Sequence, residues 1–405
     1  GQKVNDVPIP GTEFALVKDM LEPPPQPGDE VQDQLYIWGK DPRYPDNAPL
    51  NRVTPVDLGQ GPVNVTAANF AVANTGFCVG HRCYGRIGNV DFSASGSLIV
   101  DATDADNLPG AEGTFAIKCG ANHCCGYDEL EEGANLHCWG NNTDWQLGCI
   151  GDCREGNRQD NYANTAGAAP GEHIRGLALG EKHTCVHISA MVGPDVTQCV
   201  GDNTQGQLGD PDRLNNNHLF LSTQLGNGSP LVGMGLLFGG SNHACVKVED
   251  VIGRTTTPGM YCWGKNGEGQ TGLPISNFEA SAPYNNPVQG TDPGGEFNPE
   301  PNPFGADANN DTTCWTPMGS MGVVCMGSNT QGLIDPIDPV SRVSSHTPRL
   351  VPNIPGNINA LSVGRTTACL TTRLEQGGEL ICWGNRSGGM TAQPITLTTH
   401  TLGPN

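Results

Sequence analysis

The chain has 405 residues, with 56 Gly and 32 Pro, and aromatic residues make up only 6% of it. This composition favours many short strands joined by tight turns over long amphipathic helices. The formal net charge is −21, which argues against sequence-independent binding to phosphate backbones, because such binding needs clustered Lys and Arg. No apolar run reaches the ~18 residues of a membrane-spanning helix. We therefore expect no nucleic-acid partner and no membrane insertion.

A short phrase that ends in a small or aromatic residue followed by glycine recurs seven times along the chain. Its spacing of roughly fifty to sixty residues indicates a repeat architecture. In chain order the copies are Tyr36-Ile37-Trp38-Gly39, Arg82-Cys83-Tyr84-Gly85, His137-Cys138-Trp139-Gly140, Gln198-Cys199-Val200-Gly201, Tyr261-Cys262-Trp263-Gly264, Val324-Cys325-Met326-Gly327 and Ile381-Cys382-Trp383-Gly384.

A second phrase, Gly-x-x-His-x-Cys in its fullest form, stands ahead of each copy of the first. It is complete at residues 120–125, 180–185 and 240–245, and weaker versions occupy residues 73–78, 309–314 and 364–369. Residues 11–16 also fit, with Leu16 in the cysteine position. The two phrases together predict seven β-hairpins.

The cysteines follow this alignment. In six hairpins a cysteine of the first strand faces a cysteine of the second, and Leu16 with Ile37 replaces such a pair in the remaining hairpin. Facing residues of antiparallel strands hold their Cβ atoms ~4.5–5.5 Å apart, close to disulfide geometry. The predicted disulfides are Cys78–Cys83, Cys125–Cys138, Cys185–Cys199, Cys245–Cys262, Cys314–Cys325 and Cys369–Cys382, with Cys119–Cys124 and Cys149–Cys153 pairing the other four cysteines.

Zinc binding by Cys and His is the rival interpretation of these residues. It requires ligands that converge, whereas the cysteine pairs are dispersed once per repeat. Disulfides closing loops of about a dozen residues contribute roughly 3 kcal/mol each. An even, in-register set of cysteines indicates an oxidising compartment, so we expect a secreted or cell-surface protein and, because the chain starts at Gly1 without a signal peptide, a processed mature chain.

The fourth repeat illustrates the expected fold of each unit. It contains three expected strands in succession, at residues 174–179, 183–186 and 197–200. The loop that follows, 201–209, is rich in residues that tolerate positive φ. A further strand often comes after such a loop, and four short antiparallel strands make one propeller blade. Small residues near Gly180 and Gly201 would let neighbouring blades approach each other at the axis. The Trp, Tyr, Val or Met of the first phrase would fill the space between blades.

The combined string of Gly-x-x-His-x-Cys, Cys-Trp-Gly-x-Asn and Gly-Gln-Leu-Gly resembles the regulator of chromosome condensation repeat, in its cysteine-bearing secreted variants. The resemblance implies an all-β, seven-bladed propeller with four-stranded blades over residues 1–405. It also implies a ring closed by pairing strands from both chain ends, with residues 394–398 beside residues 14–17 and 35–38. Residues 1–10 would then be an extension, 11–58 the first blade region and 399–405 a tail.

Exchange-factor activity and chromatin binding, known in the nuclear members of that family, do not fit an acidic, disulfide-rich chain. The resemblance extends to a bacterial β-lactamase inhibitor with the same propeller, but fold analogy does not transfer activity. No Gly-x-Ser-x-Gly elbow, His-Glu-x-x-His pair or phosphate loop is present in the sequence. The repeated His123, His183 and His243 are expected to be structural, each bonding a turn in the ring. We therefore predict no enzymatic activity and no required cofactor.

Acidic insertions are the candidates for an ion site. Asp101, Asp104 and Asp106 place three carboxylates within six residues, and calcium takes six to eight oxygen ligands from such clusters. Asp307, with the residues at 309–311, forms a similar group. A solvated surface loop is the alternative in both places, because neither segment has the full spacing of a calcium-binding loop.

Two further sets of residues suggest surface functions. Trp145 and Trp315 lie outside the blade motif and are candidate exposed anchors. Five Asn-x-Ser/Thr triplets are candidate glycosylation sites, headed by Asn64, Asn141, Asn227, Asn310 and Asn385.

The sequence favours a non-enzymatic extracellular module with a structural or adhesive function, which binds another protein or assembles with its own copies into a surface or filament. A receptor-type or inhibitor propeller that binds a different protein on one face is the main alternative. A calcium-dependent enzyme using the acidic loops is the third.

Overall fold

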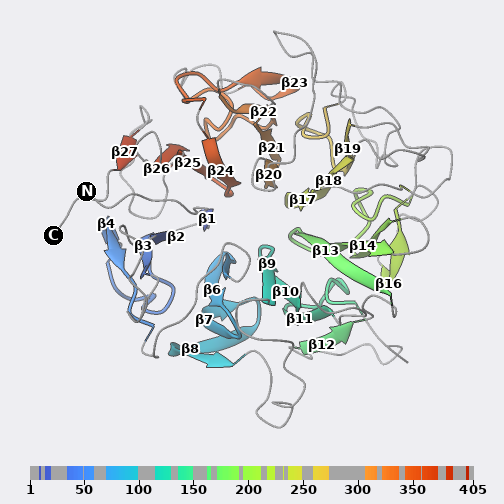
Figure 1. The fold of residues 1–405 in the computed structure, drawn as a ribbon, viewed down its shortest axis with the longest axis horizontal. Coiled ribbons are helices and arrows are strands. Elements are labelled where there is room, and N and C mark those ends of the chain that lie inside the picture. The colour runs from blue at the N-terminus through green and yellow to red at the C-terminus, as the bar shows by residue number, and fades with distance from the viewer. Residues whose placement is uncertain are drawn as a thin grey trace.

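The computed structural model shows seven antiparallel sheets arranged in a ring around a central axis (Figure 1). The chain passes from one sheet to the next in sequence order, so each sheet corresponds to one repeat and is called here blade one to blade seven. The structure describes residues 9–10, 14–19, 34–48, 50–58, 70–98, 115–128, 136–148, 162–165, 171–190, 195–210, 217–223, 231, 236–248, 259–272, 306–316, 322–336, 343–356, 358–372, 380–385 and 398–400.

Every sheet among these residues is built from strands that are consecutive in the chain. Blades one to three contain β1 (Ile9–Pro10), β2 (Phe14–Asp19), β3 (Gln34–Gly39), β4 (Leu50–Pro55); β5 (Phe70–Val72), β6 (Thr75–Val79), β7 (Arg82–Ile87), β8 (Val90–Leu98); β9 (Phe115–Cys119), β10 (His123–Asp128), β11 (Leu136–Gly140) and β12 (Tyr162–Thr165).

The other four blades are also built from consecutive strands, and the first strand of each blade lies nearest the axis. They contain β13 (Glu172–Leu179), β14 (His183–Ala190), β15 (Val196–Gly201), β16 (Asn217–Ser222); β17 (Leu237–Gly239), β18 (His243–Val248), β19 (Gly259–Gly264); β20 (Ala306–Asn309), β21 (Thr312–Trp315), β22 (Val324–Gly327), β23 (Ser345–Leu350); β24 (Ile358–Val363), β25 (Thr367–Thr372), β26 (Leu380–Gly384) and β27 (Thr398–His400). Blade five has three strands within the described residues.

The seven-bladed fold is therefore confirmed, and so is the predicted register of the hairpins. Cys185 faces Cys199 between β14 and β15, as Cys245 faces Cys262 between β18 and β19. In blade one Leu16 faces Ile37, the apolar pair expected in place of a disulfide.

The strand expected to close the ring, residues 394–398, lies outside the described residues except for Thr398. Thr398 pairs with Cys382 in blade seven and not with blade one. Blade one instead supplies its own inner strand, β1, which pairs with β2 and contacts β24 and β25 of blade seven. Residues 9 and 10, expected in a terminal extension, form this strand. Within the described residues, blade one and blade seven thus meet through the packing of β1 against β24 and β25.

Tryptophan side chains fill the spaces between blades, as the sequence predicted. Trp139 of blade three packs with Cys78 and Cys83 of blade two. Trp263 of blade five packs with Cys185 and Cys199 of blade four. The fully buried indole of Trp383 packs with residues of blade six in the same way. The apolar core is consequently divided into clusters between neighbouring blades rather than gathered in one place.

The glycine that opens the second phrase marks the closest approach between blades at the axis. The Gly180 N–H donates to the His183 carbonyl oxygen across a tight turn. A Cβ at Gly180 would lie 2.7 Å from the carbonyl oxygen of Ser241 in the next blade. Only glycine leaves room for that neighbouring turn, which explains why this position recurs as glycine in the complete copies of the phrase.

Backbone hydrogen bonds between these turns join five consecutive blades around the axis. Asn74 N donates to Ala121 O, Ala121 N to Gly180 O, Glu181 N to Ser241 O, and Ser241 N to Asn310 O, at 2.8 to 3.2 Å. The inner rim from blade two to blade six is therefore held by main-chain bonds that do not depend on side-chain identity.

The part of the chain that the structure describes contains no helix with the length and apolar character to cross a bilayer.

Candidate functional site

An axial cavity of about 140 Å³ lies where the inner strands converge. Small and aliphatic residues make up most of its wall, with a few polar side chains among them. Its lining comes from residues 71–74, 118–121, 177–180, 236–241, 306–309, 361–363 and Arg365, one segment from each of blades two to seven.

Two cations and one carboxylate project from this lining. Lys118 and Arg365 are exposed, and neither side chain forms a hydrogen bond or ion pair within the described residues. Asp307 is partly buried, and its burial raises the pKa of the carboxyl, an effect partly offset by the Lys118 charge and by hydrogen bonds. The described wall thus carries a net positive charge in a chain of net charge −21.

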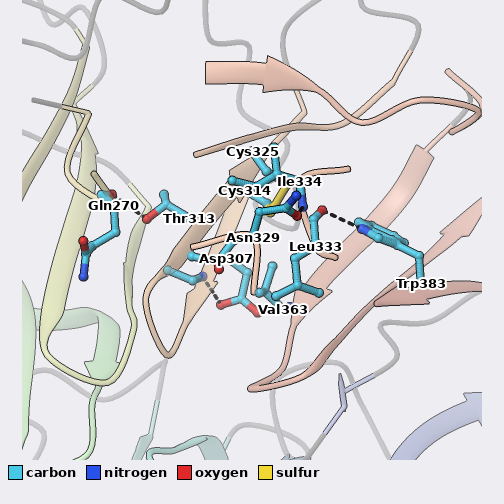
Figure 2. Close-up of a disulfide and its surroundings, with 12 residues drawn as sticks. Gln270, Asp307, Thr313, Cys314, Cys325, Asn329, Leu333, Ile334, Val363 and Trp383 are labelled. Atoms are coloured by element: carbon cyan, nitrogen blue, oxygen red, sulfur yellow. Dashed lines mark hydrogen bonds between the residues drawn. A yellow bond between two sulfur atoms is a disulfide. The ribbon is translucent and has the colours of Figure 1, made fainter. Parts of the chain in front are cut away.

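Asp307 fastens blade six to blade seven. Its Oδ2 accepts hydrogen bonds from Val363 N at 2.7 Å and from Ser362 Oγ at 3.0 Å, while Oδ1 accepts one from Ala308 N at 2.9 Å. Figure 2 shows Asp307 and Val363 beside each other. Blade six is thus joined to blade seven by a side chain, whereas blades two to six are joined to one another by backbone hydrogen bonds between their axial turns.

The acidic group at 307–311 does not form an ion site. Asp311 turns away from Asp307 and binds Lys265 Nζ at 2.9 Å and Gln270 Nε2 at 2.8 Å. Because the two carboxylates serve different blade junctions, the hypothesis of a calcium cluster at this segment is wrong. Asp101, Asp104 and Asp106 lie outside the described residues, and calcium binding there remains a prediction.

Four similar connecting loops extend from the third strand of blades three to six, over residues 141–148, 202–209, 265–272 and 328–335. Each is braced by the asparagine at its second position, whose Oδ1 accepts a hydrogen bond from the backbone N–H five residues later at 2.9 to 3.1 Å. In the first three loops the glutamine at the sixth position also accepts, through Oε1, from the N–H two residues before it. The loops are therefore rigid by their own sequence.

The carbonyl at the sixth loop position accepts a hydrogen bond from the next blade, and two donor types alternate in this role. In the first type a threonine donates. Thr184 Oγ1 bonds Gln146 O at 2.7 Å, and Thr313 Oγ1 bonds Gln270 O at 2.8 Å, as Figure 2 shows for Thr313. We call this arrangement the Thr latch.

In the second type a tryptophan indole donates to the same loop position. Trp263 Nε1 bonds Gln207 O at 2.9 Å, and Trp383 Nε1 bonds Leu333 O at 2.9 Å (Figure 2). The residues that face each other across the hairpin explain the choice. Thr184 faces Val200 and Thr313 faces Met326, whereas Ala244 faces Trp263 and Ala368 faces Trp383. We call the second arrangement the Trp latch; a small alanine makes room for the indole.

Two of the repeated histidines belong to the Thr latch, and they bond the next blade rather than the turn that the sequence suggested. His123 Nε2 lies 2.8 Å from Thr184 Oγ1, and His243 Nε2 lies 2.8 Å from Thr313 Oγ1. Each threonine hydroxyl already donates its one proton to a loop carbonyl, so it accepts from an Nε2–H of the neutral histidine. The ring nitrogens of His183 have no hydrogen-bond partner among the described residues, because the next blade carries Ala244 at the position of the latch threonine.

Burial keeps all three histidines neutral. Burial, with a smaller contribution from a neighbouring histidine, lowers the pKa of His123 and His183 to about 3, and burial lowers the pKa of His243 to about 4. A pKa this far below neutrality excludes a charged imidazole near pH 7. The histidines are thus structural, as the sequence indicated.

The connecting loops and the axial turns lie at the same end of the blades and form one surface, which we call the loop face. The N–H of Asp202 donates to Lys182 O, and Lys265 N donates to Asn242 O, so loops and turns are joined by backbone bonds. Ion pairs cross the blade boundaries, with Lys182 Nζ 3.4 Å from Asp144 and Lys265 Nζ 2.9 Å from Asp311. The result is a rigid surface of mixed charge.

The predicted cysteine sites are present wherever the structure describes them. Seven of the eight expected disulfides are formed, including Cys119–Cys124 and the short Cys78–Cys83 bridge, and no described cysteine is free. Cys149 and Cys153 lie outside the described residues. Because the bridged sulfurs are not available as thiolates, zinc binding by these cysteines is excluded.

The expected surface residues have mixed outcomes. Trp315 is buried between blades five and six, so it is not an exposed anchor. Trp145 is half-buried in a connecting loop. Of the five sequon asparagines, Asn385 is exposed and Asn141 and Asn310 are partly exposed, while Asn64 and Asn227 lie outside the described residues. Glycosylation at all five stays a prediction.

Comparison with known proteins supports the fold. The chain superposes on human WBSCR16 with a TM-score of 0.61 and 14% identity, over 92% of this chain and 94% of the other. It superposes on Prp20p from Saccharomyces cerevisiae, which binds Gsp1p and histones, with a TM-score of 0.57 and 13% identity, over 96% of this chain and 83% of the other. No family model and no curated protein matches the sequence. The comparisons therefore show that the chain has the β-propeller fold.

Proposed function

We propose that this protein is a non-enzymatic interaction module with a structural or adhesive role outside the cell. The observation that carries this proposal is the state of the cysteines. Blades two to seven each hold a disulfide across the same hairpin, and no described cysteine is free. Disulfides repeated in this way form and persist in oxidising compartments, which supports a function at the cell surface or in the extracellular space.

The loop face supports protein binding. Its loops are braced internally and bonded to the axial turns, so a partner that docks there does not have to order them. Fixed Lys182–Asp144 and Lys265–Asp311 pairs present alternating charges across the blade boundaries. A surface of this kind suits a polar protein partner, and its rigidity would contribute to specificity.

The outer edge of blade six supports association between copies. β23 is the last strand of its sheet, and edge strands carry backbone groups available for pairing with another chain. Leu350, at the end of this strand, is 50% exposed, and Val343, just before it, is 64% exposed. If this edge binds a different patch on a second copy, the contact repeats without closing and produces a filament.

The oligomeric state of the native protein tests the proposal. We expect light scattering and negative-stain electron microscopy to show assemblies that grow with concentration, and the double variant Val343→Asp/Leu350→Asp to be monomeric. Tyr44→Asp is the matched control, because Tyr44 is also exposed, at 47%, but belongs to the loop of blade one. A native protein that stays monomeric at every concentration would contradict self-assembly.

A receptor-type or inhibitor function is the second candidate, and the loop face is the observation that favours it. Cross-linking of the native protein in its own extracellular medium distinguishes the two. Links from Lys182 and Lys265 to a different protein would support the second function, because both lysines lie on the loop face. Links between copies of this chain near β23 would support the first.

A further inference from the structure

Two disulfides from neighbouring blades meet at the boundary between blades two and three. The Sγ atoms of Cys78, Cys119 and Cys124 lie within 4.8 Å of one another, although Cys78 is bonded to Cys83 and Cys119 to Cys124. All four cysteines pack in the same apolar cluster. None of the other disulfides in the described residues has a third cysteine sulfur so near.

One of these sulfurs is reachable from the axial cavity. Cys119 is partly exposed and lies on the cavity wall, whereas Cys78, Cys83 and Cys124 are fully buried. The neighbouring Lys118 is exposed on the same wall. A small anionic thiolate that enters the cavity is therefore attracted by the Lys118 ammonium and reaches the Cys119 sulfur first.

We propose that these two disulfides form a thiol-exchange site, at which a low-molecular-weight thiol converts two intrablade bridges into one bridge between blades. In the first step a thiolate attacks Cys119 Sγ. The bond between Cys119 and Cys124 breaks, its electron pair leaves on Cys124 Sγ, and Cys119 becomes a mixed disulfide with the small thiol.

In the second step the Cys124 thiolate attacks Cys78 Sγ. The Cys78–Cys83 bond breaks, and Cys83 leaves as a thiolate that takes a proton from solvent. The product contains a Cys78–Cys124 disulfide between β6 and β10, a thiol at Cys83 and the blocked Cys119. One thiol is consumed and one is released while two disulfides are kept, so the sequence needs no oxidant or reductant besides the small thiol.

The exchange has a structural consequence at this boundary. Blade two has no connecting loop of the kind found in blades three to six, since β7 runs through a tight turn at Gly88 into β8. The indole N–H of Trp139 accordingly has no hydrogen-bond acceptor among the described residues. A bridge between Cys78 and Cys124 would supply a covalent link between blades where no latch exists.

Peptide mapping of the native protein tests the proposal. The folded chain is incubated with reduced glutathione without denaturant, alkylated and digested without reduction. We expect glutathione on Cys119, alkylated Cys83 and a peptide pair linked through Cys78 and Cys124, with Cys245–Cys262 unchanged. Intact original pairs, or glutathione on Cys119 without the new link, would overturn it; so would equal attack on every disulfide.

Two single variants give an independent test that adds no thiol. Cys83→Ser leaves a thiol at Cys78 beside the Cys119–Cys124 bridge, and we expect that thiol to redistribute to Cys119 or Cys124. Cys199→Ser is the matched control, because it leaves Cys185 with no second disulfide nearby. Far-ultraviolet circular dichroism establishes that both variants fold. A thiol that stays entirely on Cys78 would contradict the proposal.

Lys118→Gln tests the access route. We expect several-fold slower glutathionylation of Cys119, because glutathione is anionic, and an unchanged rate with the neutral thiol 2-mercaptoethanol. An equal rate with both reagents would show that the Lys118 charge has no part in the exchange.

Discussion

The boundary between blades four and five and the boundary between blades two and three belong to the same ring but are held differently. The first has a Trp latch, with Trp263 Nε1 bonded to Gln207 O, and a backbone bond from Glu181 N to Ser241 O. The second keeps the backbone bond but has a buried Trp139 indole without an acceptor among the described residues, packed against two disulfides. Blade two thus lacks the connecting loop that would accept a latch, and its boundary with blade three is packed with apolar side chains and disulfide sulfurs instead.

The largest expected difference between the two boundaries is the loss of stability at acidic pH. His123, His183 and His243 have pKa values of about 3, 3 and 4 in the folded protein, whereas an unfolded histidine titrates near ~6.5. As the pH falls below ~6.5 the unfolded chain binds up to three protons that the folded chain excludes, so stability is lost by about 4 kcal/mol per pH unit near pH 5.

Hydrogen exchange measured between pH 7 and pH 4.5 checks this dependence. Peptides of blades three to six should lose protection before those of blade two, where Gly76 occupies the histidine position. His243→Thr is the matched control, because Thr312 and Thr367 fill this position in blades six and seven. The variant should lose about a third of the histidine-dependent slope. A slope equal to that of the native chain would show that these histidines do not cause the acid sensitivity.

Substitution of the axial glycine comes next in expected size. A Cβ on Gly180 would meet Ser241 O at 2.7 Å as well as the His183 ring, so Gly180→Ala should lower the free energy of unfolding by about 3 kcal/mol. Chemical denaturation measures the change. Gly176→Ala in the preceding strand β13 is the control, since its nearest new contact is Leu237 Cβ at an ordinary 3.6 Å, and it should shift stability by less than about 0.5 kcal/mol.

The Thr latch offers a smaller effect and a rescue. Thr184→Val removes the hydroxyl and leaves Gln146 O and His123 Nε2 without partners, so we expect a loss of about 2 kcal/mol. The double variant Thr184→Ala/Val200→Trp should recover part of that loss, because it copies the Ala244 and Trp263 pair of the next blade. Equal stability of the double variant and Thr184→Ala would show that the two latch types are not interchangeable.

The smallest expected difference compares two tryptophans directly. Trp263→Phe removes a hydrogen bond to Gln207 O, whereas Trp139→Phe removes a buried N–H that has no partner in the described residues. The two changes delete the same side-chain volume, so Trp263→Phe should cost about 1 kcal/mol more than Trp139→Phe in thermal or chemical unfolding. An equal cost would indicate that the indole bond adds nothing to packing.

Features that repeat with the sequence period could be predicted from it. The facing cysteines, the apolar pair of Leu16 and Ile37 and the tryptophans between blades all follow from the alignment of two phrases. The partners of Asp307 and Trp383 could not be found in that way, because Val363 and Leu333 belong to other blades and lie 50 or more residues away in the chain. The sequence shows that some hairpins pair Thr with Val or Met and that others pair Ala with Trp. That these pairs are alternative donors to one loop carbonyl could be seen only in the structure.

The inner strand of blade one could not be predicted for a different reason. β1 is only Ile9–Pro10 and carries no phrase of its own. Its pairing with β2 is local, and its contacts with β24 and β25 join blade one to blade seven. The axial cavity also escaped the sequence, since its wall is assembled from one short segment of each of six blades.

Both latch types have the same polarity along the chain. The group that donates to the loop carbonyl belongs to the repeat synthesised later, and that carbonyl belongs to the repeat before it. A nascent chain that pauses between two repeats would leave at its growing edge an oxygen that water can solvate, while the indole or hydroxyl that needs it has not yet been made. The molecule can therefore assemble from its N-terminal side one repeat at a time, with water solvating the loop carbonyl until the next repeat supplies its donor.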